Sequence, residues 1–167
     1  MKLDTLKKLY VEQLKDLHSA ESQMIEALPK MAAAASAAKL RQAFEHHLKE
    51  TREHRARIER IFKNLDFSPG GHKCKAMEGL IKEGAEIIKE DGDAKVKDAA
   101  LVCAAQKVEH YEIGSYGCVH AYARLLGENE AADLLAKTLQ EEKHADETLN
   151  ELAEGWINTF AKSAGPA

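Results

Sequence analysis

The sequence has few of the residues that build disulfide-linked or sheet-rich proteins. Only three cysteines occur in 167 residues, and aromatic residues make up 5% of the chain. Cys74, Cys103 and Cys118 form no Cys-x-x-Cys pair, so the sequence predicts neither a disulfide framework nor a thiol redox motif. We therefore expect a reducing compartment, the cytoplasm, with the cysteines as small buried side chains.

Long hydrophobic runs are also missing. The longest uninterrupted one, residues 99–105 (AALVCAA), is far shorter than the ~20 residues that span a bilayer. Charges are scattered through residues 1–16 (MKLDTLKKLYVEQLKD), unlike a secretory signal. The 24 basic and 28 acidic residues give a net charge of −4 without a dense basic patch, so neither a membrane nor a nucleic acid is expected as a partner.

Most of the chain has helical periodicity. Three prolines and ten glycines interrupt stretches in which apolar residues recur every three or four positions. Ser36 and Asp93 are candidate caps at helix starts, and Gly127 and Gly155 are candidate stops at helix ends. The pattern predicts one domain over residues 1–167, with helices at about 3–35, 37–65, 75–90, 94–126 and 130–154 and a short C-terminal tail.

The expected fold class is all-α. Two pairs of long helices, each joined by a tight turn, are linked by a long connection between helices 2 and 3 that carries the short helix. This connectivity predicts a ferritin-like four-helix bundle with one long crossover.

Carboxylates interrupt the apolar faces of all four long helices, where leucine would be usual. On the apolar face of the second helix, either Glu50 or Thr51 takes the inward position between His47 and His54. In each hairpin, acids lie equally far from the turn, which puts them at about the same height. The acids concerned are Glu21, Glu50, Glu109, Glu112, Glu142 and Asp146.

A cluster of carboxylates inside an apolar bundle needs compensating positive charge, because like charges cannot all ionise together in a medium of low polarity. No Lys or Arg shares these faces at the same level. The sequence therefore predicts a pair of divalent metal ions bridged by acids. The expected ligand set is one Glu from each of two helices and a Glu-x-x-His from each of the other two.

This sequence departs from that set. His54 follows Glu50 by four positions rather than three, and Ala145 replaces the histidine after Glu142. The one true motif, Glu141-x-x-His144, lies off the apolar line and is expected to face solvent. His47 and His110 are candidates to orient the acids. The predicted metal ligands are Glu21, Glu50, His54, Glu109, Glu112, Glu142 and Asp146, with the main ligand of the third helix left open between Glu109 and Glu112.

Several segments resemble the YciF-like bacterial stress proteins of the ferritin-like superfamily, in the same order over nearly the whole chain. They are LHSAESQMIEALPKMA (17–32), LRQAFEHHLKET (40–51), CKAMEGLIKEG (74–84), AAQKVEHYEIGSYG (104–117) and LQEEKHADETL (139–149). The resemblance implies a ferritin-like bundle, a homodimer and a dinuclear metal site of the rubrerythrin type. It also implies carboxylate ligands at Glu21, Glu50, Glu109, Glu112 and Glu142.

Two functions fit these features. In the first, two iron ions, with manganese as the alternative, reduce peroxide or oxygen or oxidise ferrous iron in a stress response. An external reductant is then required, because the chain has no Cys-x-x-Cys electron donor. In the second, a structural stress-response bundle binds metal adventitiously or not at all. Iron storage is a weaker third candidate, since nothing in the sequence specifies a symmetric cage. The expected assembly is a homodimer, formed through the short helix and the Trp156 tail.

Overall fold

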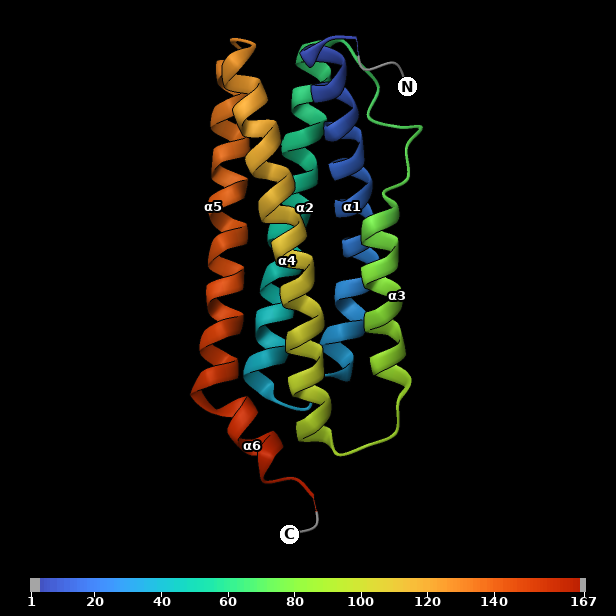
Figure 1. The fold of residues 1–167 in the computed structure, drawn as a ribbon, viewed down its shortest axis with the longest axis vertical. Helices are drawn as coiled ribbons and strands as arrows, with labels where there is room; N and C mark the ends of the chain where they lie inside the picture. Colours follow the sequence, from blue (N-terminus) through green and yellow to red (C-terminus); the bar gives the residue numbers. More distant parts are fainter. Residues whose placement is uncertain (1–3, 166–167) are drawn as a thin grey trace.

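Four long helices run side by side in the computed structural model, which describes residues 4–165 (Figure 1). No strand occurs within these residues, and the prediction of an all-α four-helix bundle is confirmed. The predicted start of the first helix at residue 3 lies outside the described residues. The helices of the bundle are α1 (Leu6–Ala34), α2 (Ala38–Leu65), α4 (Ala94–Leu125) and α5 (Asn129–Leu152).

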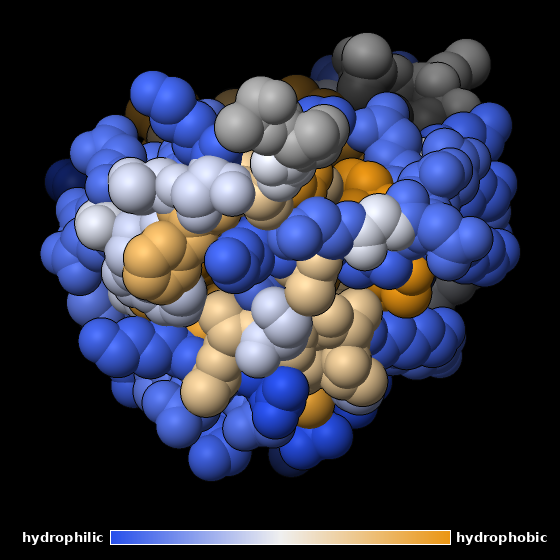
Figure 2. All heavy atoms as spheres, turned by 90° about the horizontal axis from the view of Figure 1, so that it is seen from below, coloured by the Kyte–Doolittle hydropathy of each residue, from blue (hydrophilic) through white to orange (hydrophobic). Residues whose placement is uncertain are grey.

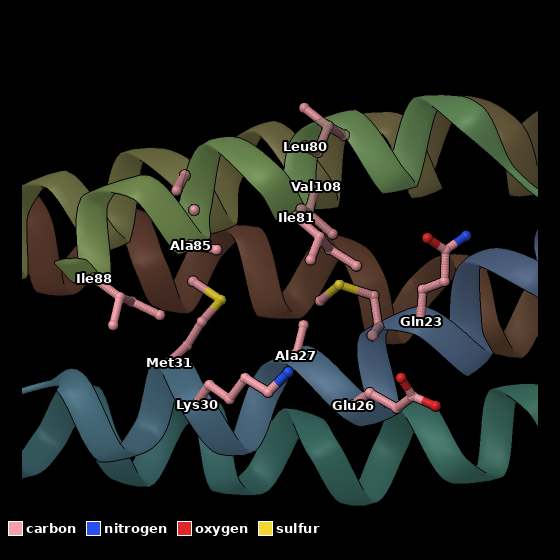
Figure 3. A pocket seen from close by; sticks show the side chains of 13 residues that line it. Gln23, Glu26, Ala27, Lys30, Met31, Leu80, Ile81, Ala85, Ile88 and Val108 are labelled. Carbon is pink, nitrogen blue, oxygen red and sulfur yellow. The ribbon is translucent and has the colours of Figure 1, made fainter.

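The connectivity is that of two hairpins and one crossover. α1 and α2 pack against each other along their length, as do α4 and α5. Between the hairpins the chain returns along the outside of the bundle and forms α3 (Lys75–Lys89), which packs on α1 and α4. A groove of about 150 Å³ lies between α1 and α3, lined mainly by apolar side chains such as Met31, Leu80 and Ile88 (Figure 3).

The turn between α1 and α2 is capped from α4. The predicted Ser36 cap is wrong, because the position before α2 is Ala37 and no side chain of the turn caps the helix. Instead, the carboxylate of Asp98 accepts hydrogen bonds from the backbone N–H of Ser36 at 2.8 Å, its hydroxyl at 2.6 Å and the backbone N–H of Ala37 at 2.9 Å. Asp98 is 3% exposed and thus ties the second hairpin to the turn of the first.

The other helix ends follow the sequence in part. Asp93 caps α4 by accepting from the backbone N–H of Lys95, and Gly127 ends the α4 region with a φ of 76°, both as predicted. Gly155 does not end the last helix. It lies in a π-helical turn, η1 (Ala153–Ile157), through which the helix continues from α5 into α6 (Asn158–Lys162).

The end of the bundle nearest the C-terminus, where α6 lies, exposes apolar surface. Figure 2 shows apolar side chains on this end among charged ones. Phe160 is 49% exposed, and its ring lies edge-on to that of Trp156 with the ring centres 5.6 Å apart. At the opposite end, just after α2, Phe67 is 47% exposed.

The interior contains two apolar clusters rather than one. The first includes Met24, Phe44 and Leu149, and the second includes Leu14, Ile58 and Leu135. Cys74 belongs to the first cluster, but Cys103 and Cys118 are exposed, so the expectation of buried cysteines holds only for Cys74. None of the described helices combines the length and the apolar character that a crossing of the membrane requires.

Candidate metal centre

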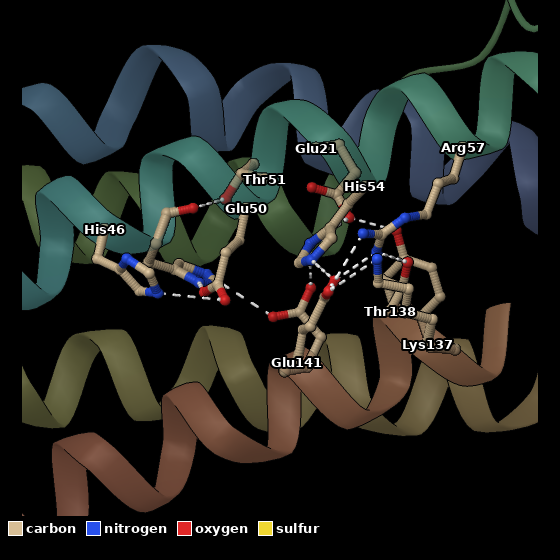
Figure 4. Close-up of polar contacts among 12 residues, drawn as sticks. Glu21, His46, Glu50, Thr51, His54, Arg57, Lys137, Thr138 and Glu141 are labelled. Atoms are coloured by element: carbon tan, nitrogen blue, oxygen red, sulfur yellow. Dashed lines mark hydrogen bonds and ion pairs between the residues drawn. The ribbon is translucent and has the colours of Figure 1, made fainter. Parts of the chain in front are cut away.

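A layer of buried acids and histidines lies between the two apolar clusters, near the middle of the bundle. Figure 4 shows the polar contacts of part of this layer, including Glu21 and His54. Each of the four long helices contributes to this layer. On α1, Glu21 lies between Leu17 of one cluster and Met24 of the other. Six side chains of the layer are 5% exposed or less: Glu21, His47, His54, Glu109, Glu112 and Glu142.

The layer contains two groups of side chains whose ligand atoms lie close enough to share a metal ion. Glu21, His54 and Glu142 form one group, with the ligand atoms within 4.8 Å of one another. His54 Nδ1 lies 2.9 Å from Glu142 Oε1 and 3.7 Å from Glu21 Oε1. Three different helices, α1, α2 and α5, therefore converge on this group.

The second group is formed by His47, Glu109, Glu112 and Glu142, again within 4.8 Å of one another. His47 Nε2 lies 3.3 Å from Glu109 Oε1 and 3.7 Å from Glu142 Oε2. The sequence left the choice between Glu109 and Glu112 open, and both lie in this group. Glu142 belongs to both groups and offers one carboxylate oxygen to the histidine of each, as a carboxylate bridging two ions would do.

Many polar atoms of the layer lack hydrogen-bond partners. They are Glu21 Oε2, both ring nitrogens of His47, His54 Nδ1, Glu109 Oε2, Glu112 Oε1 and both oxygens of Glu142. Buried polar groups are normally satisfied, and a cluster of exceptions needs an explanation. Carboxylate oxygens and imidazole nitrogens are ligands for iron and manganese, so the residues present fit a dinuclear metal site.

The pKa values of the layer also show that its buried charges are not fully compensated. Burial raises the pKa of Glu21 to about 8, although His54 nearby opposes this shift. Burial, then the charges of Glu142 and Glu21, raises the pKa of Glu112 well above its ordinary value of 4.5. Burial alone would lower the pKa of His47, but the carboxylates, Glu109 first, raise it to about 10. Without metal, protons and histidinium charges partly compensate the acids, and a metal ion would have to displace those protons.

Outer contacts orient two of the ligand candidates. The hydroxyl of Tyr116 donates a hydrogen bond to Glu21 Oε1. His54 Nε2 lies 3.0 Å from Glu141 Oε2, and because a carboxylate only accepts, the Nε2–H donates. In the neutral ring this leaves the lone pair of His54 on Nδ1, facing Glu21 and Glu142.

Glu141 is itself held by Arg57. The Arg57 guanidinium donates to both carboxylate oxygens of Glu141, and it also donates to the Thr138 hydroxyl at 3.0 Å. The expectation that Glu141 faces solvent is therefore wrong, whereas His144, the other end of its motif, is exposed. Arg57 is not among the residues predicted from the sequence, because it lies beside the apolar face of α2 and reaches the layer from its edge.

Two predicted ligands lie outside the two groups. Glu50 is at the edge of the layer, with its side chain 21% exposed, because the inward position between His47 and His54 is taken by Thr51. Asp146 is 17% exposed and lies beside His110, with Oδ1 3.4 Å from the ring. The structure brings together Glu21, His54, Glu109, Glu112 and Glu142, and it adds His47, which sequence reasoning placed only as an orienting residue.

Comparison with known proteins gives a consistent result. The family model described as "Domain of unknown function (DUF892)" matches residues 5–162. Protein YciF of Escherichia coli (strain K12) is 44% identical over 164 residues, which cover 98% of this chain and 99% of that protein.

Solved structures of such relatives have the same fold. The crystal structure of the E. coli stress protein YciF superposes with a TM-score of 0.89 at 45% identity, covering 93% of this chain and 98% of that one. YcfI of Rhodopseudomonas palustris, to which a structural role has been attributed, gives 0.86 at 42% identity, with 89% and 95% covered. A Xanthomonas campestris protein shares the fold at 23% identity and a TM-score of 0.75, with 95% and 98% covered. The chain therefore belongs to the DUF892 family and is YciF-like over nearly its whole length.

Proposed function

We propose that this protein holds a pair of iron ions in the buried layer and uses them in the redox chemistry of peroxide, oxygen or ferrous iron during stress. The observation that carries the proposal is the sharing of Glu142 by two groups of ligand atoms, each within 4.8 Å, that together leave several buried polar atoms without partners. Manganese is the alternative metal, since the same ligand chemistry suits both.

A bound pair of ferrous ions would supply two electrons, one from each ion, which with two protons reduce peroxide to water or oxygen to peroxide. The protein's own part is to place and hold the ligands. Glu142 would serve both ions, His47 and His54 would each serve one, and Tyr116 would fix the orientation of Glu21 through its hydrogen bond. The apolar clusters above and below the layer would exclude water from the reacting groups.

The biological setting is proposed from the relatives. YciF of E. coli is described as a stress protein, and the present chain covers almost all of it. We propose the same setting here. Electrons for repeated turnover would come from an external reductant, because the chain contains no Cys-x-x-Cys pair.

Metal analysis tests the proposal directly. Protein purified without chelators, or reloaded with Fe²⁺, is expected to contain about two metal ions per chain. Glu142→Gln should lose both ions, because both groups depend on this residue. Glu147→Gln is the matched control: Glu147 lies on the same helix with its side chain 73% exposed, and its replacement should leave the metal content unchanged. Retention of both ions by Glu142→Gln would contradict the proposal.

A structural bundle without catalytic metal is the second candidate. It is favoured by the ion pairs of His47 and His54 with the acids, which already compensate part of the buried charge, and by the structural role attributed to YcfI. The two candidates differ in a simple measurement. Substoichiometric metal, with no rise in the melting temperature when Fe²⁺ is added, would support the structural role.

We also propose a homodimer formed through the α6 end and the outer face of α3. The exposed Phe160 beside Trp156 and the apolar groove between α1 and α3 are the surfaces that a second copy would cover. This part of the proposal is independent of the metal and is tested separately below.

A further inference from the structure

A row of polar side chains leads from the surface of α2 into the buried layer. In order they are His46, Glu50, His47 and Glu109, and their side chains are 68%, 21%, 7% and 3% exposed. Each touches the next: His46 Nε2 lies 3.3 Å from Glu50 Oε1, Glu50 Oε2 lies 3.7 Å from His47 Nδ1, and His47 Nε2 lies 3.3 Å from Glu109 Oε1. Figure 4 shows His46 and Glu50 beside each other on α2, at one end of the layer.

Glu50 is the central member of this row. One of its oxygens contacts the exposed His46, and the other contacts the buried His47. This position explains why Glu50 lies outside both ligand groups, although Glu50 and Glu21 are both predicted ligands. A carboxylate that is 21% exposed, at the boundary between core and solvent, can reach an ion on either side by rotating its side chain.

A cavity opens along the same row, between α2 and α5. Its volume is about 40 Å³, and its lining includes His46, Glu50 and Glu109. A single water needs only ~10–15 Å³ of such space, so a cation with a water molecule fits. The small side chains of Ala43 and Ala145 also line the cavity, and Ala145 occupies the position where a Glu-x-x-His motif starting at Glu142 would place a histidine.

The inner end of the cavity offers free ligand atoms. Glu109 is 2% exposed, and its Oε2 has no hydrogen-bond partner. Neither ring nitrogen of His47 has a hydrogen-bond partner of proper geometry. An ion arriving through the cavity would therefore meet ligand atoms that are not engaged in a hydrogen bond, and it would have to displace only their protons.

We infer that this row is the entry route for divalent cations into the metal centre, with His46 and Glu50 forming a receiving site at its mouth. The inference rests on the proposed function and deepens it. A carboxylate and an imidazole together bind Fe²⁺, Mn²⁺ and Co²⁺. The ion binds first between His46 and Glu50, and Glu50 then carries it inward to His47 and Glu109. Ala145 keeps the route open because a larger side chain there would fill the cavity.

The rate of metal uptake tests this inference, with Co²⁺ as the probe. Metal-free protein is mixed with Co²⁺ in a stopped-flow instrument and the visible absorbance of the bound ion is followed. Since capture by charged groups changes association rates by tenfold or more, His46→Ala and Glu50→Gln are each expected to slow uptake about 3- to 10-fold, and Ala145→Leu about 10-fold. The number of Co²⁺ ions bound at equilibrium should stay at the wild-type value in all three.

His110→Ala is the matched control. Its side chain is 71% exposed and pairs with Asp146 at 3.4 Å, but it does not line the cavity, so uptake should keep the wild-type rate. Wild-type rates in His46→Ala, Glu50→Gln and Ala145→Leu would overturn the inference, as would fewer bound ions in Glu50→Gln, which would make Glu50 a ligand of the centre. If the wild-type protein binds no Co²⁺, the proposed function fails together with the inference. His46 is on the surface, so its variant remains informative even if Ala145→Leu does not fold.

Discussion

Arg57 of α2 donates hydrogen bonds to both carboxylate oxygens of Glu141 on α5. This pair is half-buried, with 13% and 24% of the two side chains exposed, and Glu141 in turn accepts from His54 Nε2. These contacts fix Nδ1 as the nitrogen of His54 that faces the candidate metal centre. Removing Arg57 should therefore change the affinity for metal.

Arg57→Met is expected to weaken metal binding by about 10- to 100-fold, the usual effect of removing a group that orients a ligand. Without the guanidinium, Glu141 is free to move and His54 loses its orientation. Isothermal titration with Co²⁺ measures the change. The control is Arg60→Met, because Arg60 pairs with Glu130 in a similar way but both side chains are more than half exposed. Equal losses in the two variants would show a general charge effect instead.

Glu112→Gln is expected to stabilise the metal-free protein and to destabilise the metal-loaded one. Glu112 is 1% exposed and forms no ion pair with a basic side chain among the described residues, so its carboxyl group opposes folding. The gain in the free energy of unfolding without metal should be roughly 1–3 kcal/mol at neutral pH. Urea denaturation with and without saturating Co²⁺ gives both values. A variant less stable than wild type in both states would mean that Glu112 is held by contacts other than a metal.

Asp98→Ala is expected to lower the free energy of unfolding by about 2–3 kcal/mol, because a buried carboxylate and three hydrogen bonds are lost together. Asp93→Ala, which removes only the exposed cap of α4, should lower it by about 1 kcal/mol. Urea denaturation of the two variants in parallel checks the difference. Similar losses would show that Asp98 is an ordinary cap and does not tie the hairpins together.

The connection before α3 should weaken in acid. Asp16 pairs with His72 of this segment at 2.7 Å. It also accepts a hydrogen bond from the hydroxyl of Tyr111 on α4, which in turn lies 3.0 Å from Cys74 Sγ at the end of the segment. Burial would raise the pKa of Asp16, but these hydrogen bonds lower it below its ordinary value of 3.8. In the unfolded chain the carboxyl group therefore takes up its proton at higher pH than in the folded protein, so its stabilising contribution is complete above pH 3.8 and is lost as the pH falls below it.

The matching measurement compares wild type with Asp16→Asn by urea denaturation at pH 6 and at pH 3. The difference in stability between the two proteins should shrink at pH 3. Asp4→Asn is the control, because the Asp4–Lys8 pair is about half exposed and its removal should change little at either pH. A difference that stays constant with pH would show that Asp16 acts through packing and not through its charge.

Phe160→Glu is expected to convert a dimer into a monomer, since a charge would enter the apolar surface around Trp156. Phe67→Glu at the opposite end should leave the dimer intact, although Phe67 is exposed to nearly the same extent, 47% against 49%. Sedimentation equilibrium measures the mass of each variant. A monomeric wild-type protein, or a dimer in both variants, would reject this contact surface.

Helical periodicity and glycine placement were sufficient to predict the bundle. The long helices and the crossover helix follow from apolar residues at three- and four-residue steps, and Gly127 marks a turn that needs a positive φ. The cap of α2 could not be predicted, because Asp98 is distant from Ser36 in the sequence and meets it only after the hairpins pack. Gly155 was mistaken for a stop because a π-helical turn absorbs one extra residue without ending the helix.

On α1, α4 and α5 the sequence placed Glu21, Glu109, Glu112 and Glu142 correctly, but on α2 the inward position could be predicted only to within one residue. Glu50 and Thr51 are neighbours, and a rotation of about 100° per residue decides which of them points inward. In the structure Thr51 points inward, and Glu50 lies at the edge of the polar layer. The roles of Glu141, Arg57 and Tyr116 depend on contacts between helices, which periodicity along one helix does not contain.

The polar layer divides the interior of the molecule into two separate apolar halves, each with its own well-packed side chains. Cohesion across the midline then depends on how well the charges there are neutralised. When metal is absent, amide hydrogens at the level of the layer, near residues 47–54 of α2 and 109–112 of α4, should exchange faster than in the metal-loaded protein. Loading with metal would join the two halves into one cooperative unit. The two metal ions would then stabilise the fold as well as carry out the chemistry.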